Sequence, residues 1–181
     1  MKNKVIFFVL IILTISLSVT VFGINTNAKE SENVVLSRYT TYFGGSSIER
    51  VHNITRASNS INNITIMPKE TFSFNNTVGE ASVENGYKMA KVVVFNELVD
   101  GEGGGICQVS STLYNAIDDA KLSVLERHSH TRDIGYVPLG EDATIVYGAK
   151  DFRFTNTLNV PVKIVSKIVE HSLVVEIQKV I

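Results

Sequence analysis

Two stretches of the chain repeat apolar residues at the spacing of an α-helix. The first follows Ser46 and Glu49, which have the spacing of a capping box, so we predict a helix over about residues 47–61. The second follows a glycine-rich loop at 101–105, and its apolar residues fall on one face of a helix over about 107–120. Each predicted helix therefore has one apolar face to bury.

Most of the remaining segments have the composition and alternation of β-strands. They are rich in β-branched and aromatic residues, and glycine, asparagine or proline bounds many of them. Together with two helices, this predicts a single α+β domain with a mostly antiparallel sheet and two principal helices. The predicted strands are 34–43, 64–67, a strand end at 72–74, a hairpin of 91–95 and 98–99 around a turn at 96–97, 122–128, 144–147, 151–155, 160–169 and 173–178.

The N-terminus has the pattern of an export signal. Lys2 and Lys4 precede an almost wholly apolar run at 5–24, and the small residues at 26–28 form a fair cleavage site. The run of about 20 residues is also long enough to span a bilayer uncleaved. Residues 1–28 are therefore a signal peptide or a signal anchor, and both alternatives stay open.

Either alternative places the rest of the chain outside the cytoplasm. Lysines before an apolar segment are typical of its cytoplasmic end. We expect a short linker at 29–35 and one domain at 36–181. This domain would be anchored on the extracellular face of the membrane through residues 5–24, or secreted to the cell wall.

Composition narrows the classes of protein to which the domain can belong. Of 181 residues, 44% are apolar, which is typical of a chain that folds around a core. The net charge of −1 argues against a nucleic-acid binder, in which a basic surface would dominate. The chain has one cysteine, Cys107, which excludes an internal disulfide and any zinc site built from several thiolates.

The densest local signal surrounds that cysteine. Gly103, Gly104 and Gly105 precede it, and glycines allow positive φ angles and a close approach of the backbone to another group. Cys107 then falls in the first turn of the second helix, where free N–H groups and the helix dipole lower the pKa of a thiol. The backbone N–H groups of this turn, together with the Gln108 amide, are candidates to hold a developing oxyanion.

A thiol catalyst needs a base, and two histidines follow the second helix. If the strand at 122–128 continues, Glu126, His128 and His130 lie on one face of it, because side chains alternate along a strand. Either imidazole is a candidate base for Cys107, and we favour His130.

A carboxylate beside the imidazole would hold it in the correct tautomer. Asp142 is best placed in chain order, and Asp133 and Glu126 are its rivals. Papain-like and transglutaminase-like enzymes place a cysteine at such a helix start. The order of cysteine, histidine and aspartate along the chain is that of transglutaminase-like enzymes, which is a topological analogy.

Two other interpretations of the same residues stay open. In the first, Cys107 is a buried residue at a tight junction of loop and helix, since free cysteine is among the most buried residue types. In the second, Cys107, His128 and His130 bind a zinc ion with one open position, although no further metal-binding motif supports this. Apart from this zinc site, we expect no cofactor.

Motifs spread over residues 36–178 match the pattern of one protein family. The matching segments are 39–41, Arg50, Asn53, 68–75, 78–79, 86–87, Ala90, 103–110, 112–115, 126–128, His130, 136–140, 142–144, 151–152, Phe154 and Asn156. On these motifs, of which the glycine–cysteine segment is the most specific, the chain resembles the VanW-like family. Two positions depart from the family pattern: Lys69 stands where a glycine is usual, and Asn62-Asn63 replaces a usual Asn-Gly turn.

The resemblance implies a place in the cell more than a reaction. The family is named from a vancomycin-resistance gene cluster, is common in Gram-positive bacteria and is largely exported or membrane-anchored. It therefore implies the cell envelope, with peptidoglycan or its peptide precursors as partner.

The resemblance and the candidate site together lead to one hypothesis and one alternative. The hypothesis is a thiol-dependent acyl transferase or amidase that acts on peptidoglycan peptides. Cys107 would be the nucleophile, His130 or His128 the base, and Asp142 the orienting carboxylate. The alternative is a non-catalytic module that binds the cell wall and in which Cys107 is buried.

Overall fold

A computed structural model describes residues 33–181 of the chain. The predicted signal or anchor segment at 1–28 and the first residues of the predicted linker lie outside the described residues. Within the described range, no helix is both long and apolar enough to cross a membrane.

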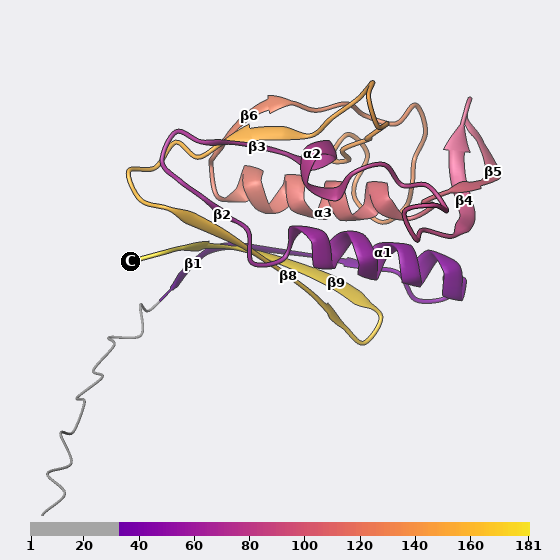
Figure 1. The fold of residues 1–181 in the computed structure, drawn as a ribbon, viewed down its shortest axis with the longest axis horizontal. Helices are drawn as coiled ribbons and strands as arrows, with labels where there is room; N and C mark the ends of the chain where they lie inside the picture. The colour runs from indigo at the N-terminus through magenta and orange to yellow at the C-terminus, as the bar shows by residue number, and fades with distance from the viewer. Residues whose placement is uncertain (1–32) are drawn as a thin grey trace, which may run out of the picture. The chain divides into compact units, whose positions relative to one another are not determined.

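The described chain has an α+β fold in which every strand pairing is antiparallel (Figure 1). This confirms the predicted fold class. The two predicted helices are present, each with 14 residues, and a short third helix accompanies them. The helices are α1 (Ile48–Ile61), α2 (Phe74–Val78) and α3 (Ile106–Asp119); the strands are β1 (Val34–Tyr42), β2 (Thr65–Ile66), β3 (Thr71–Ser73), β4 (Met89–Val94), β5 (Glu97–Glu102), β6 (Ser123–Glu126), β7 (Arg153–Thr155), β8 (Val162–Val169) and β9 (Ser172–Lys179).

A four-stranded sheet in the order β1-β9-β8-β2 forms one layer of the domain. Side chains alternate between the two faces of a strand, so apolar residues at alternate positions point to the same face. Ile164, Val175 and Ile177 are examples, and all three are fully buried. Helices α1 and α3 contact each other and cover one face of this sheet (Figure 1). The Ser47 side chain caps α1 by accepting a hydrogen bond from the Arg50 backbone N–H.

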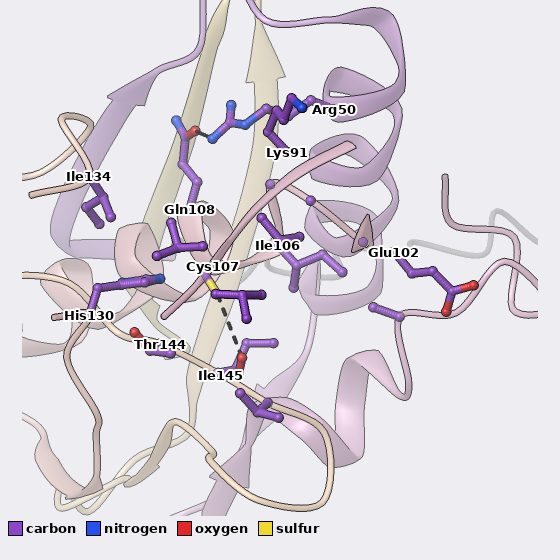
Figure 2. A pocket seen from close by; sticks show the side chains of 18 of the residues that line it. Arg50, Lys91, Glu102, Ile106, Cys107, Gln108, His130, Ile134, Thr144 and Ile145 are labelled. Atoms are coloured by element: carbon purple, nitrogen blue, oxygen red, sulfur yellow. Dashed lines mark hydrogen bonds between the residues drawn. The ribbon is translucent and has the colours of Figure 1, made fainter. Parts of the chain in front are cut away.

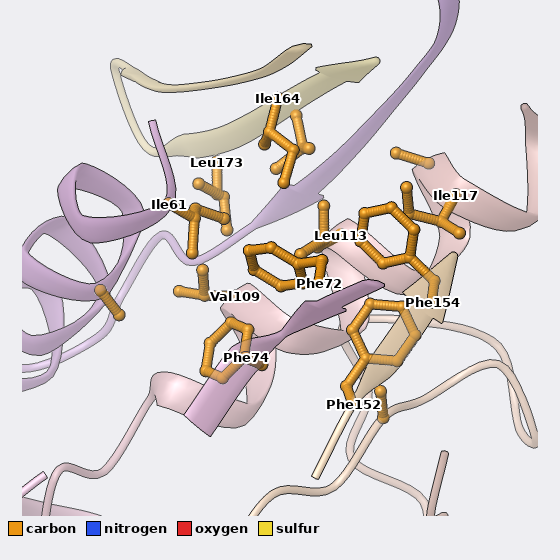
Figure 3. Close-up of a cluster of buried hydrophobic side chains, with 14 of the residues drawn as sticks. Ile61, Phe72, Phe74, Val109, Leu113, Ile117, Phe152, Phe154, Ile164 and Leu173 are labelled. Carbon is orange, nitrogen blue, oxygen red and sulfur yellow. The ribbon is translucent and has the colours of Figure 1, made fainter. Parts of the chain in front are cut away.

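Helix α3 lies between this layer and a second sheet of order β3-β7-β6 (Figure 1). Phe72 and Phe154 stack across β3 and β7 with ring centres 5.2 Å apart, and Figure 3 shows them beside Leu113 and Ile117 of α3. Because α3 is covered on two sides, most of its polar side chains are also buried. They must therefore find hydrogen-bond partners inside the protein.

Strands β4 and β5 form a two-stranded hairpin of their own. Its turn lies at Phe95 and Asn96, one residue earlier than predicted, and both residues have positive φ. Phe95 is 99% exposed at the tip. The base of the hairpin joins the glycine loop that begins α3, so the hairpin and the start of that helix share one region of the molecule.

Three further local predictions differ from the structure. The strand predicted at 122–128 ends at Glu126, because the next backbone groups bond to a loop, including Thr144 N–H to His128 C=O at 2.7 Å. The predicted strand at 144–147 is a loop with a single isolated bridge. Helix α2 was missed because its five residues are too few to show a helical period.

Candidate functional site

A cavity of about 690 Å³ lies between the β4–β5 hairpin and the start of α3. Its wall also includes Arg50 of α1 and parts of the loops at 130–136 and 144–147. Figure 2 shows several of these side chains around Cys107. Of the predicted site residues, the cavity is lined by Gly103, Gly104, Gly105, Cys107, Gln108 and His130 but not by His128 or Asp142.

The three glycines bring three parts of the chain close together. A Cβ atom at Gly104 would lie 2.6 Å from the Lys91 carbonyl oxygen of β4, and one at Gly103 would lie 2.6 Å from the Ala81 Cβ. Gly105 is the N-cap of α3 and has a φ of 111°, which favours glycine. The glycines are therefore required by packing and backbone geometry, whatever the chemistry at Cys107.

Cys107 lies in the first turn of α3, as predicted, where it is the second residue, and its side chain is partly exposed to the cavity. Its thiol donates a long hydrogen bond of 3.8 Å to the Ile145 carbonyl oxygen. In Figure 2 this contact links α3 to the loop on the other side of the cavity.

Burial raises the pKa of the Cys107 thiol above its ordinary value. Backbone hydrogen bonding at Ile145 opposes the rise, the negative charge of Asp142 adds to it, and the positive charge of Arg50 opposes it. The lowered pKa predicted from the helix start is therefore wrong for the free protein, since loss of hydration outweighs the helix terminus. The resting thiol is neutral and needs a base to react.

The Gln108 amide is not a free oxyanion donor. Its Nε2 donates both hydrogens, to Thr41 Oγ1 at 2.9 Å and to the Tyr42 carbonyl oxygen at 3.1 Å. The Gln108 backbone N–H is also used, in a 3.0 Å bond to the Gly105 carbonyl oxygen. The amide oxygen of Gln108 accepts a 2.7 Å bond from Arg50, so this side chain positions an arginine at the cavity.

His130 and Asp142 form the closest pair of ionisable side chains near Cys107. His130 Nδ1 lies 2.6 Å from Asp142 Oδ2, and the same oxygen accepts the His130 backbone N–H at 2.6 Å. The two side chains are only 8% and 6% exposed. In Figure 2 the His130 ring points toward the Cys107 sulfur. The structure thus places the cysteine and the favoured histidine on the wall of one cavity, and the favoured aspartate is hydrogen-bonded to that histidine.

His128 has a different partner. Its Nε2 lies 3.0 Å from Glu126 Oε1, and Glu126 also accepts the Asp151 backbone N–H at 3.0 Å. These two hydrogen bonds hold the pKa of the Glu126 carboxyl below its ordinary value. His128 therefore pairs with Glu126 and does not line the cavity, and Glu126 is not the carboxylate beside His130. The other rival, Asp133, lines the cavity and accepts the Gly135 backbone N–H.

The predicted zinc ligands are not assembled as a set. Among residues 33–181, no three histidine, cysteine, aspartate or glutamate side chains group in a way that could hold a metal ion. His128 and His130 do not share one strand face, because β6 ends before them and each ring turns to its own carboxylate.

Buried polar residues of α3 hold the loop that carries Asp142. Ser111 donates to the Cys107 carbonyl oxygen and accepts the Ala143 backbone N–H at 2.9 Å, and Asn115 donates to the Glu141 carbonyl oxygen at 2.7 Å. Ser110 donates to the Ala143 carbonyl oxygen at 2.5 Å. Their role was not predicted from the sequence. The available signal was the presence of polar residues on a helix that is apolar enough to be buried, because such residues need partners inside the protein.

Comparisons with known proteins found one matching family and two similar proteins. A family model described as "VanW like protein" matches residues 49–178. The chain is 51% identical over 132 residues to a Bacillus subtilis (strain 168) protein named YoaR, a match that covers 73% of this chain and 44% of the relative. It is 32% identical over 112 residues to the Enterococcus faecalis (strain ATCC 700802 / V583) protein named "Vancomycin B-type resistance protein VanW", covering 59% of this chain and 41% of that relative. The matches therefore span less than half the length of either relative, and no solved structure matches at a significant level.

Proposed function

Because this chain belongs to the VanW-like family, we propose that it is a cell-envelope protein whose site acts on the peptides of peptidoglycan. The family is linked to vancomycin resistance through the relative that is named for it. The proposed reaction is thiol-dependent acyl transfer or amide hydrolysis. Cys107 is its nucleophile, His130 its base and Asp142 the carboxylate that orients His130.

The reaction begins with proton transfer from the Cys107 thiol to His130 Nε2 as the sulfur attacks the carbonyl carbon of a substrate amide. Asp142 accepts the hydrogen on Nδ1 and so selects the tautomer that leaves Nε2 free. The imidazolium then gives its proton to the leaving amine as the C–N bond breaks and a thioester remains. Water or a second amine attacks the thioester, His130 takes the proton of the attacking group, and the thiol is restored.

The His130–Asp142 pair is the single observation that carries this proposal. His130 has a buried carboxylate on its Nδ1 and lines the same cavity as Cys107. A general base for that thiol needs this arrangement. The raised pKa of the Cys107 thiol requires such a base, because little thiolate is present before the substrate binds.

The test compares muropeptide profiles and glycopeptide sensitivity of cells that carry wild-type protein, Cys107→Ala or His130→Gln. We expect both variants to match a deletion strain while the protein is still made and folded. His128→Gln is the matched control, because it changes the neighbouring histidine that pairs with Glu126. Wild-type profiles in Cys107→Ala and His130→Gln cells would overturn the enzymatic proposal.

A second candidate is a non-catalytic module that binds the cell wall. The observation that favours it is the raised pKa of Cys107, since a neutral thiol at a tight helix start is also what a structural cysteine shows. In that case Cys107→Ala would keep wild-type muropeptides and wild-type binding to isolated peptidoglycan, whereas the enzymatic proposal predicts changed muropeptides.

The proposed location depends on the N-terminal segment. We propose that residues 1–28 direct export, after which the domain stays on the extracellular face of the membrane or is released to the wall. Cell fractionation and N-terminal sequencing of the mature protein test this. A mature chain that begins near residue 29 would indicate cleavage, an intact N-terminus in the membrane fraction would indicate an anchor, and a cytoplasmic pool would contradict export.

A further inference from the structure

Arg50 presents a positive charge to the cavity that contains Cys107. It projects from the first turn of α1, and Figure 2 shows its guanidinium reaching the amide of Gln108. Nη1 donates to Ser46 Oγ at 2.9 Å and Nη2 donates to Gln108 Oε1 at 2.7 Å. These bonds use two of the five N–H groups of the guanidinium and fix its direction.

No protein carboxylate neutralises this charge in the described part of the chain. Six pairs lie within salt-bridge distance there, and none of them includes Arg50. Lys91, another cation of the cavity wall, is paired with Asp100 at 2.9 Å. The carboxylates that line the cavity, Glu80, Glu102 and Asp133, are all outside salt-bridge distance of Arg50.

The acidic groups that act on the pKa of Arg50 are uncharged near neutral pH. Burial lowers the pKa of the guanidinium, and the acidic groups that act on it are the Tyr136 phenol and the Cys107 thiol. Burial raises the pKa of both, so both are neutral near neutral pH. Arg50 Cζ lies 6.0 Å from the centre of the Tyr136 ring, which is a weak substitute for an anion. A partly desolvated cation is stabilised best by a carboxylate that arrives with a ligand.

We propose that Arg50 binds a carboxylate of the substrate, so that the Cys107 site selects acyl compounds with a free carboxylate near the reacting carbonyl. This inference rests on the proposed function and adds a substrate class to it. Peptides that end in a free carboxylate, or that carry a side-chain carboxylate beside the reacting bond, belong to this class. Their amides or esters do not, because they offer no negative charge to the guanidinium.

Two alkylating reagents test the inference without knowledge of the substrate. Iodoacetate and iodoacetamide both transfer a two-carbon group to the sulfur and release iodide, and they differ in a carboxylate or a carboxamide. The experiment measures the ratio of the two alkylation rates at Cys107 in the full-length chain, relative to the same ratio for free cysteine. We expect the relative ratio to favour iodoacetate by about tenfold or more in the wild type.

Variants of two arginines on α1 show which charge is responsible. Arg50→Met keeps the apolar stem, and we expect it to bring the relative ratio to about that of free cysteine. Arg50→Lys, a milder change, should retain part of the preference, because it keeps the charge and loses the planar fork. Arg56→Met is the matched control, because this substitution removes the same charge from the same helix. The Arg56 side chain stacks on Tyr87 and does not line this cavity. We expect it to keep the wild-type ratio.

Several outcomes would overturn the assignment. One is a wild-type ratio no higher than that of free cysteine, and another is a preference that survives in both Arg50 variants. A third is an equal slowing of both reagents in Arg50→Met that leaves the relative ratio at its wild-type value, because Arg50 would then act only through the Cys107 pKa and not on the carboxylate of the reagent. Failure of the proposed function would be a separate result. If His130 is not the base for Cys107, iodoacetamide would alkylate Cys107 at the same rate in wild type and in His130→Gln.

A binding measurement covers the case in which Cys107 does not react. N-acetylglycine and N-acetylglycinamide differ in the same carboxylate and carboxamide, and their binding to the full-length chain can be followed by NMR titration. We expect N-acetylglycine to perturb resonances of the cavity residues in wild type and Arg56→Met, and to lose this effect in Arg50→Met. Equal binding of the acid and the amide by the wild type would reject the carboxylate site.

Discussion

At the scale of single residues, the state of Cys107 depends on a balance between burial and local charge. The helix start and Arg50 favour a thiolate, whereas loss of hydration and the nearby Asp142 charge favour the neutral thiol. Burial is the largest of these effects, so the pKa rises. The proposed reaction then uses a base in the transition state rather than a preformed thiolate.

The raised pKa of Cys107 predicts a loss of stability at alkaline pH. Below about pH 8.5, the ordinary thiol pKa, the folded and unfolded chains both keep the proton and the contribution is complete. Above that pH the unfolded chain loses the proton first, so wild type should lose stability relative to Cys107→Ala. Denaturant unfolding of both proteins from about pH 7 to about pH 10 measures this difference. An unchanged difference over this range would contradict the raised pKa.

Lys69 and Asn63 have positive φ angles, of 66° and 63°. These are the positions at which the family pattern has glycine, so the structure gives a physical reason for that pattern. A side chain in the left-handed region is strained, and asparagine tolerates it better than lysine does.

We therefore expect Lys69→Gly to raise the free energy of unfolding by about 0.5–1 kcal/mol. Relief of strain should exceed the extra entropy that glycine gives the unfolded chain. Asn63→Gly serves as a comparison and should have a smaller effect. Thermal melting of the three proteins measures the difference, and a lower melting temperature for Lys69→Gly would reject this explanation.

At the scale of elements, α3 is the part that organises the site. Gly105 begins it, Cys107 lies in its first turn, and Ser111 and Asn115 hold the loop that carries Asp142. Helix α1 packs directly against the start of α3 and contributes Arg50. The candidate site therefore depends on a close approach of two helices at one glycine.

Gly105→Ala tests that close approach. A Cβ atom there would lie 3.0 Å from Arg50 Cγ and from Ile54 Cγ1, in addition to the strain of a φ of 111°. We expect it to lower the free energy of unfolding by about 1–3 kcal/mol and to displace Arg50. Gly148→Ala is the control for φ alone, since its φ is 76° and a Cβ would meet nothing within 4 Å. Equal losses in the two variants, measured by denaturant unfolding, would show that the helix contact is unimportant.

At the scale of the whole described domain, two sheets share one core through α3. Phe154 of the second sheet and Phe152, which directly precedes strand β7, are fully buried, as are Ile164 and Leu173 of the first sheet. Because all of them belong to one hydrophobic cluster, we expect the layers to unfold together.

Phe154→Ala should lower the free energy of unfolding by about 3–5 kcal/mol through the cavity it leaves. Phe95→Ala is the matched control, because Phe95 is exposed at the hairpin tip, and its effect should stay within about 0.5 kcal/mol. Unfolding is followed by far-ultraviolet and near-ultraviolet circular dichroism. Coincident transitions at both wavelengths are expected, and separate ones would show that the two sheets unfold independently.

The sequence by itself determined the features that follow from local order. The period of apolar residues located α1 and α3 within one or two residues, and the glycine run placed Cys107 at the start of α3. Hydrogen bonds within a helix join residues four positions apart, so a short segment of sequence is enough to predict where a helix lies. Chain order also favoured Asp142 as the carboxylate, and the catalytic roles of Asp142 and His130 stay a prediction.

Tertiary structure alone decided which of these residues meet and in what state. The loop after β6 leaves the sheet, so His128 turns to Glu126 and His130 to Asp142. Arg50 reaches the cavity because α1 packs on α3, a contact between residues 58 positions apart in the chain. The direction of the Cys107 pKa shift likewise depends on burial by loops distant in sequence. Local patterns cannot specify these features, because desolvation and long-range contacts exist only once the layers have packed.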